Sequence, residues 1–175
     1  MEEDMKYPIG HPAIPQDITM EHIRNWILEM ENAPTLLMDA VRGLTPEQLD
    51  TPYRPGGWTV RQVVHHLADT HVNTYITFRR TLTEERPSIP GHDVNGWADL
   101  MDAKTGDIGV SLALFDSLQE RFANLLWTMN EVDFRRKYRR ADGSERDLAT
   151  TLGVYAWHGR HHAAHITRLR EKMEW

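Results

Sequence analysis

The segment SLALFDSLQERFANLLWTM, residues 111–129, has the clearest helical pattern in the sequence. Its apolar side chains recur at alternating spacings of three and four residues: Phe115, Leu118, Phe122, Leu125 and Met129. This spacing places them on one stripe of a helix, as in the seam of a helical bundle. The segment therefore predicts a helix that packs against other helices through a single apolar face.

Three further segments carry helical periodicity, and we expect helices over about residues 19–42, 59–83 and 147–172. The helix over 59–83 has a start signal, because Thr59 and Gln62 form a capping-box pattern just before a run of apolar residues. We find no convincing β pattern and no internal repeat. Four long helices predict an all-α four-helix bundle that occupies residues 1–175 as one domain.

The segments between these helices contain residues that interrupt regular structure. Residues 85–108 include two prolines and several glycines, so they predict a long crossover between the second and third helices, with a short helix near residues 93–101. Residues 131–146 are rich in arginine and contain the turn pair Asp142-Gly143. A surface loop or a small hairpin is expected there.

The composition excludes several classes of function. The chain has 175 residues, with 26 acidic and 20 basic side chains and a formal net charge of −6, which disfavours a nucleic-acid partner. It has no cysteine, so a transition-metal site must use imidazole or carboxylate ligands. The first twenty residues lack a signal-peptide pattern, and no apolar run reaches membrane-spanning length. We expect a soluble cytoplasmic protein with no membrane partner.

Histidine is the main chemical signal, because seven of the ten histidines fall in two of the predicted helices. These are His65, His66 and His71 in one helix and His158, His161, His162 and His165 in the other. Residues four apart on a helix lie on the same face, so two such imidazoles can point at one centre. This clustering predicts a metal site inside the bundle.

Periodicity distinguishes some of these histidines from others. His158 and His162 lie within roughly 60 degrees of the apolar stripe of their helix, so this pair points into the bundle. The pair His161 and His165 lies to one side of the stripe and is the second choice. On the other helix, periodicity does not decide between His65 and His66. The alternative interpretation is that the histidines are ordinary core residues with satisfied hydrogen bonds.

Three imidazoles on one metal ion would form an open site. Neutral imidazole is the commonest zinc ligand in proteins, and three protein ligands leave a fourth tetrahedral position for water or substrate. A metal with three neutral ligands keeps its full positive charge and can lower the pKa of bound water to about 7. The pattern is therefore typical of a catalytic metal site.

Two segments resemble the signature segments of a known family. They are YRPGGWTVRQVVHHLAD, residues 53–69, and YAWHGRHHAAHI, residues 155–166. Both are similar to segments of the YfiT-type metal-dependent hydrolases of the DinB-like superfamily. The resemblance extends along nearly the whole chain, including the YPIG sequence that starts at Tyr7.

The resemblance implies an up-down-down-up bundle, a homodimer and one divalent metal ion, zinc or nickel, per subunit. Matched residue by residue, it assigns the metal to His66, His158 and His162. It also implies metal-dependent hydrolysis of a small-molecule substrate, although it does not identify that substrate. One alternative is a metal-dependent thiol S-transferase of the bacillithiol-transferase type, and a second is a non-catalytic binding domain held together by its metal.

Asp69 is the candidate catalytic residue, because it lies one turn beyond His66 and could orient a ligand imidazole or act as a general base. The alternative is a solvated helix residue. Thr59, Thr70 and Ser144 lie in no recognisable nucleophile motif, so a Ser-His-Asp mechanism is not supported.

Other charged and aromatic residues have plain structural interpretations. Arg160 and Arg168 could hold an anionic substrate at the mouth of a cleft, but helical arginines are usually solvated. The basic run over residues 135–140 is interleaved with acidic residues, which favours a solvated loop. Three tryptophans could line a pocket, although bulky aromatic residues at helical spacing more often belong to the core: Trp58, Trp127 and Trp157.

Overall fold

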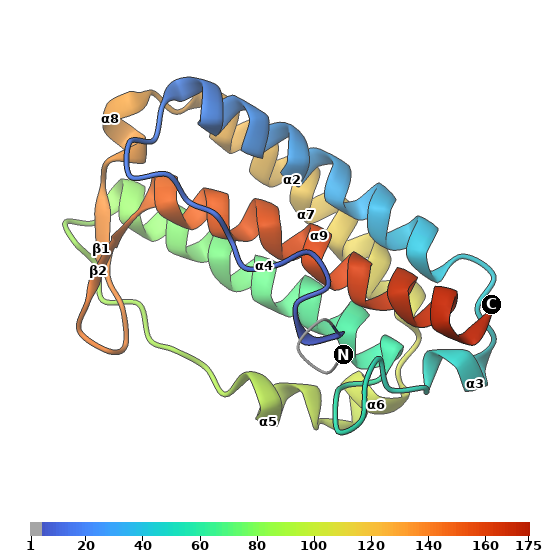
Figure 1. The fold of residues 1–175 in the computed structure, drawn as a ribbon. Coiled ribbons are helices and arrows are strands. Elements are labelled where there is room, and N and C mark those ends of the chain that lie inside the picture. The colour runs from blue at the N-terminus through green and yellow to red at the C-terminus, as the bar shows by residue number, and fades with distance from the viewer. Residues whose placement is uncertain (1–4) are drawn as a thin grey trace.

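The computed structural model describes residues 5–175, and four long helices dominate it (Figure 1). In Figure 1, α2 and α9 run in one direction and α4 and α7 run in the opposite direction, so the bundle is up-down-down-up. The all-α four-helix bundle predicted from the sequence is confirmed. The long helices are α2 (Met20–Val41), α4 (Val60–Thr83), α7 (Ile108–Thr128) and α9 (Leu148–Met173).

The connections between the long helices contain only short elements. The chain between α4 and α7 returns along the whole bundle and carries α5 and α6, as the predicted crossover requires (Figure 1). A two-stranded antiparallel hairpin, β1 and β2, precedes α9, and its turn contains Gly143 at a φ of 81°. The short elements are α3 (Pro46–Leu49), α5 (Val94–Ala98), α6 (Met101–Thr105), α8 (Glu131–Phe134), β1 (Lys137–Arg139) and β2 (Glu145–Asp147).

Side-chain caps mark where the four long helices begin. At the start of α4, the Thr59 hydroxyl accepts from the Gln62 N–H at 3.2 Å, and the Gln62 Oε1 accepts from the Thr59 N–H at 2.9 Å. This confirms the predicted capping box. Helix α7 begins three residues before the predicted start at residue 111, because the Asp107 carboxylate accepts from the Gly109 N–H at 2.8 Å and caps the helix there.

The interior of the bundle contains two apolar clusters rather than one. Near the hairpin, the first cluster includes Phe78 of α4 and Phe122 of α7. Toward the other end, the second includes Leu67 of α4 and Phe115 of α7. On α4, α7 and α9, polar residues lie between the two clusters, and three of them contact one another in sequence: His71, Gln119 and the half-buried His158. We call these three residues the polar layer. Within residues 5–175, every helix is too short or too polar to cross a bilayer.

The cap of α4 offers a test of what holds this helix in place. Replacing Thr59 with Ala removes the acceptor for the Gln62 N–H and should lower the free energy of unfolding by about 1 kcal/mol. Urea unfolding of the metal-free protein measures this difference. Thr59→Ser keeps the hydroxyl and should unfold close to wild type. Equal stability of the Ala and Ser variants would show that the cap contributes nothing.

Candidate metal centre

Three imidazole rings converge between α4 and α9. His66 comes from α4, and His158 and His162 come from successive turns of α9. The Nε2 atom of His158 lies 3.3 Å from Nε2 of His66 and 3.1 Å from Nε2 of His162. One ring nitrogen from each of the three residues lies within 4.8 Å of the others. The three nitrogens therefore face a common centre.

These separations fit a tetrahedral metal ion. Zinc-to-imidazole bonds of 2.0–2.1 Å at tetrahedral angles place neighbouring nitrogen atoms about 3.3 Å apart. Three neutral imidazoles also form a donor set that suits zinc and neighbouring divalent transition metals. The residues at this centre therefore fit a divalent metal ion and leave one coordination position without a protein ligand.

Burial keeps the three rings in the neutral form that binds metals. It is the main cause, ahead of the charges of His92 and His165, that lowers the pKa of His66 from 6.5 to about 4. The pKa values of His158 and His162 are also lowered well below 6.5, first by burial and then by the charge that each histidine would place on the others. At neutral pH, each ring therefore has one nitrogen with a free lone pair.

Hydrogen bonds on the far side of two rings orient them. The Nδ1 atom of His66 lies 3.1 Å from the Thr70 hydroxyl, one turn along α4. The Nδ1 atom of His162 lies 3.3 Å from Nδ1 of His165, whose Nε2 lies 3.0 Å from the carbonyl oxygen of Lys6. A carbonyl only accepts, so His165 donates from Nε2 and accepts from His162 Nδ1–H. That tautomer leaves the lone pair of His162 Nε2 facing the centre.

A cavity of about 390 Å³ opens beside the three histidines. The Trp58 ring forms part of its wall, with its centroid 4.6 Å from that of His66. Two cationic side chains, Lys6 and Arg54, also line the cavity. Among the described residues, no carboxylate lines it. The cavity is therefore positively charged although the chain as a whole carries a net charge of −6.

The comparisons with known proteins agree with this geometry. The sequence model of the DinB superfamily matches residues 29–166. The chain belongs to the DinB superfamily. Among the proteins similar to this chain, a Bacillus cereus protein is 48% identical over 172 residues, which cover 98% of this chain and 99% of the relative. A Bacillus mycoides protein is 47% identical over 173 residues, which cover 99% of each chain. Both relatives carry the name "putative metal-dependent hydrolase".

A solved structure has the same fold. YfiT from Bacillus subtilis superposes with a TM-score of 0.96 and 46% sequence identity, covering 98% of this chain and 99% of YfiT. YfiT is described as a probable metal-dependent hydrolase with an unusual four-helix bundle topology. This match agrees with the resemblance that the two histidine-containing segments predicted.

The structure separates the remaining histidines from the convergent three. His65, the alternative to His66, turns away and its Nδ1 lies 2.7 Å from the Ser111 hydroxyl. His161, from the second-choice pair, stacks on Trp157 with ring centroids 4.2 Å apart. Its partner His165 supports His162 from behind, as described above. Neither His65 nor His161 reaches the common centre.

Asp69 does not lie where an orienting residue for His66 would have to be. The Thr70 hydroxyl occupies the Nδ1 side of His66, and Asp69 is not among the residues that line the cavity. Burial raises the pKa of the Asp69 carboxyl, and nearby Asp102 raises it further. Its role as a general base stays a prediction from the sequence.

For the other candidate residues, the structure agrees with some of the sequence interpretations and differs from others. Arg160 pairs with Glu29 at 3.2 Å and Arg168 pairs with Glu171 at 3.0 Å, and neither arginine lines the cavity. Trp58 both lines the cavity and packs against the second apolar cluster. Trp127 is 45% exposed, so its assignment to the core was wrong, because its indole N–H reaches out to Glu31 at 3.0 Å.

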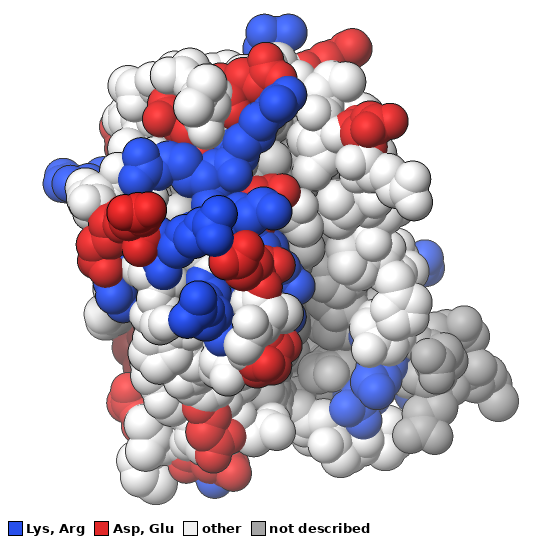
Figure 2. All heavy atoms as spheres, turned by 90° about the vertical axis from the view of Figure 1, so that its left-hand side faces the viewer, with Lys and Arg blue, Asp and Glu red and all other residues white. Residues whose placement is uncertain are grey.

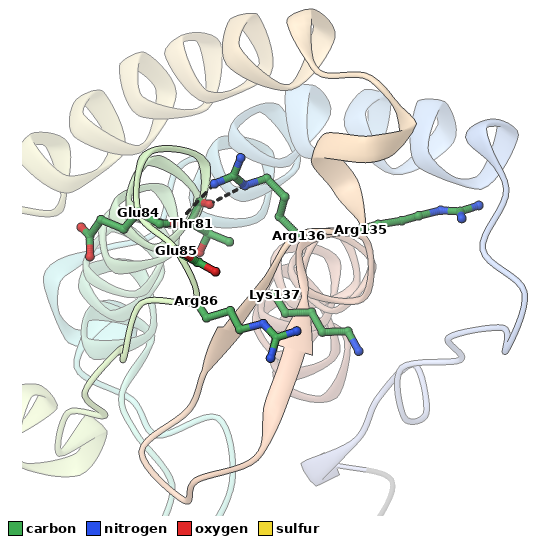
Figure 3. A pocket seen from close by; sticks show the side chains of 7 residues that line it. All are labelled: Thr81, Glu84, Glu85, Arg86, Arg135, Arg136 and Lys137. Carbon is green, nitrogen blue, oxygen red and sulfur yellow. Dashed lines mark hydrogen bonds between the residues drawn. The ribbon is translucent and has the colours of Figure 1, made fainter.

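The basic residues near the hairpin form a separate surface. Figure 2 shows this end of the molecule, where Lys and Arg side chains alternate with Asp and Glu side chains. A cavity of about 340 Å³ lies here, but Arg136 turns into the fold and donates to the carbonyl oxygens of Thr81 at 2.8 Å and Glu84 at 3.2 Å (Figure 3). Arg135 pairs with Glu131. The exposed pair of Arg135 agrees with the interpretation of a solvated loop, whereas Arg136 and strand β1 do not, because Arg136 binds backbone carbonyls of the fold and β1 pairs with β2.

Sequence reasoning missed the residues that shape the cavity. Tyr53, Arg54 and Tyr155 lie inside the two segments that carry the family resemblance, yet no spacing rule identifies them as cavity residues. Lys6 comes from the segment before α2. Thr70 could have been found, because it lies four residues after His66 and therefore on the same helix face.

The buried histidines predict how acid affects the metal-free protein. Burial lowers the pKa to about 4 in His66 and His165 and to about 3 in His71, whereas the unfolded chain titrates near 6.5. Below pH 6.5 the unfolded state therefore binds more protons. Their contribution to stability is complete above that pH and is lost as the pH falls toward 3–4, at up to about 1.4 kcal/mol per pH unit for each histidine.

Urea midpoints of the metal-free protein at pH 7.5, 6 and 5 measure this loss. The midpoint should fall at each step, and most steeply below pH 6. His71→Gln removes one of the titrating groups and should flatten the dependence. A midpoint that stays constant from pH 7.5 to 5 would contradict the assignment of these histidines as neutral buried groups.

Proposed function

We propose that this protein is a metal-dependent hydrolase in which His66, His158 and His162 hold one divalent metal ion, zinc or nickel. The observation that carries the proposal is the convergence of their three ring nitrogens beside an accessible cavity. A purely structural zinc site normally has four protein ligands, whereas three ligands and an adjacent cavity are typical of a catalytic site. The names of the relatives support the same reaction class.

The residues of the chain have distinct roles in this proposal. When bound, the metal supplies Lewis acidity toward water and toward a carbonyl or phosphoryl oxygen of the substrate. Thr70 and His165 hold the His66 and His162 rings in the orientation that keeps their Nε2 lone pairs on the centre. Trp58 covers one side of His66 and limits access of bulk water to it.

The charge of the cavity supports a small-molecule substrate with an anionic group. Lys6 and Arg54 line the cavity together with the histidines, and no described carboxylate compensates them there. The Nε atom of Arg54 donates to the Tyr53 hydroxyl at 3.2 Å and its Nη1 donates to the Pro55 carbonyl at 3.2 Å, so the guanidinium is held in place at the cavity. An arginine fixed in this way favours a carboxylate or phosphate in the substrate.

Thiol transfer is the second candidate function. The lining of the cavity favours it over one form of hydrolysis, that in which a carboxylate acts as the general base. No described carboxylate lines the cavity, whereas a thiol bound at a cationic centre needs no carboxylate to lose its proton. Asp69 would have to act from outside this lining if it served as a general base.

The proposal also includes a homodimer and a cytoplasmic location.

Removing any one ligand should remove the metal. His66→Ala, His158→Ala and His162→Ala should each lose more affinity for Zn²⁺ than the roughly 10- to 100-fold that loss of an outer partner costs. Elemental analysis and chelator competition measure this loss. His65→Ala is the matched control, because His65 neighbours His66 on α4 and does not face the centre. Full metal retention in one of the three variants would remove that residue from the ligand set.

The reaction is tested with the metal-loaded protein on carboxyl esters, amides and phosphoesters, each in a neutral and an anionic form. Turnover should stop when a chelator removes the metal and return when the metal is restored. Arg54→Gln should raise the KM for the anionic substrates roughly tenfold, because a charge-assisted hydrogen bond is lost, and should leave the neutral substrates unchanged. Arg160→Gln, outside the cavity, is the control.

Parallel assays with a low-molecular-weight thiol and a model electrophile separate the two candidate reactions. Metal-dependent conjugation without hydrolysis would favour thiol transfer. If the metal-loaded protein catalyses neither reaction, both candidate functions are rejected and a non-catalytic metal-binding domain is favoured.

A further inference from the structure

The third ligand, His158, is supported from behind by the other two residues of the polar layer. Its Nδ1 lies 3.4 Å from Nε2 of His71, and Nδ1 of His71 lies 3.0 Å from Nε2 of Gln119. His71 is fully buried and Gln119 is 1% exposed. The contacts form a chain of hydrogen bonds from Gln119 on α7 through His71 on α4 to His158. The Gln119 and His71 end of this chain is closed to solvent.

The direction of this chain follows from the amide group. The Gln119 Nε2 atom is only a donor, so His71 accepts at Nδ1 and carries its proton on Nε2. His71 then donates to Nδ1 of His158, which places the proton of neutral His158 on its Nε2. The Nε2 atoms of His66 and His162 lie within reach of that N–H, at 3.3 and 3.1 Å, and share it as acceptors. In this state the Nε2 of His158 has no lone pair for a metal.

Turning the Gln119 amide by half a rotation reverses every bond in the chain. The Gln119 oxygen then accepts from His71 Nδ1–H, and Nε2 of His71 accepts from His158 Nδ1–H. Nε2 of His158 loses its proton and presents a lone pair to the centre. Each of the two imidazoles carries one proton before and after, so the reversal needs no net uptake or release of protons by this pair.

The surroundings of Gln119 leave both orientations open. Its Oε1 is buried and has no hydrogen-bond partner among the described residues. The other neighbour of the amide is the sulfur of Met30, 3.8 Å from Nε2, which is a weak acceptor. Either orientation leaves one end of the amide without a strong partner, so neither is strongly preferred. The chain behind His162 differs, because it ends on the carbonyl of Lys6 and has a fixed direction.

We propose that Gln119 and His71 are positioning residues that form a reversible relay, in which the orientation of the Gln119 amide sets the tautomer of His158 and thereby its ability to bind the metal. The relay rests on the proposed metal site. It predicts that metal binding moves the proton of His71 from Nε2 to Nδ1, although His71 does not face the centre.

Long-range ¹⁵N–¹H NMR of the imidazole rings tests the relay directly, because it distinguishes the two neutral tautomers. At pH 7.5, His71 and His158 should carry their protons on Nε2 in the metal-free protein. After addition of Zn²⁺, both should carry them on Nδ1. His71→Gln identifies the signals of His71 by their loss. An unchanged His71 tautomer in wild-type protein that has bound Zn²⁺ would overturn the relay.

Variants of Gln119 test the same relay through metal affinity. Gln119→Met has nearly the same shape and no hydrogen-bonding amide, and it should weaken Zn²⁺ binding about 10- to 100-fold. Gln119→Glu presents only acceptors as a carboxylate, so it should keep the affinity within about threefold of wild type and hold His71 with its proton on Nδ1 even without metal. Thr81→Val is the control, because it removes a buried hydroxyl at the far end of α4.

Thermal unfolding of each metal-free variant separates loss of relay from loss of fold. If folded Gln119→Met binds Zn²⁺ as tightly as wild type, or if Gln119→Glu loses as much affinity as Gln119→Met, the relay is rejected. These outcomes leave the proposed hydrolase intact, because they concern metal affinity and tautomers, not turnover. Failure of the wild-type protein to bind Zn²⁺ would instead reject the metal site and the relay together.

Discussion

The structure depends on a constraint inside its core: most of the core is apolar, so the buried imidazoles must find hydrogen-bond partners among the few polar groups there. Each buried polar group that lacks a partner costs about 1–3 kcal/mol, so such a layer is tolerated only when its hydrogen bonds or a metal satisfy it. The polar layer interrupts the core between the two apolar clusters. Those clusters supply the packing, and the layer supplies the chemistry.

Packing of α2 against α9 fixes the position of the two ligands on α9, His158 and His162. A Cβ atom added to Gly159, the residue after His158, would lie 3.0 Å from the Cβ of Ala33 on α2, so the two helices approach closely at this level. A larger residue at either position would push α9 outward and change the direction of the His158 ring. The ligands therefore lie on rigid helices, and the cavity residues Lys6 and Arg54 come from the segments that surround them.

Local sequence patterns predicted the helices well because each helix has its own apolar stripe and, in α4, its own capping box. The same patterns predicted that His158 and His162 share a face, since that relation lies within one helix. They did not distinguish His65 from His66, because His66 lies at the edge of the stripe and its ligand partners are on another helix. The resemblance to the DinB-like family was needed there. Gln119 was not predicted at all, since it reaches the centre through two other side chains.

The three ligands differ in how their hydrogen-bond partners must change when the imidazoles adopt the tautomers that bind a metal ion. The hydroxyl of Thr70 can donate or accept by rotating in place, so His66 can adopt the binding tautomer without disturbing its neighbours. The carbonyl of Lys6 already holds His162 in that tautomer through His165. His158 alone depends on an amide that must turn over inside a packed core. Close packing makes such a rearrangement a change between two discrete states and not a gradual adjustment. The support of His158 therefore limits how readily the centre changes between its metal-free and metal-bound arrangements, and this limit arises from the same buried layer that creates the site.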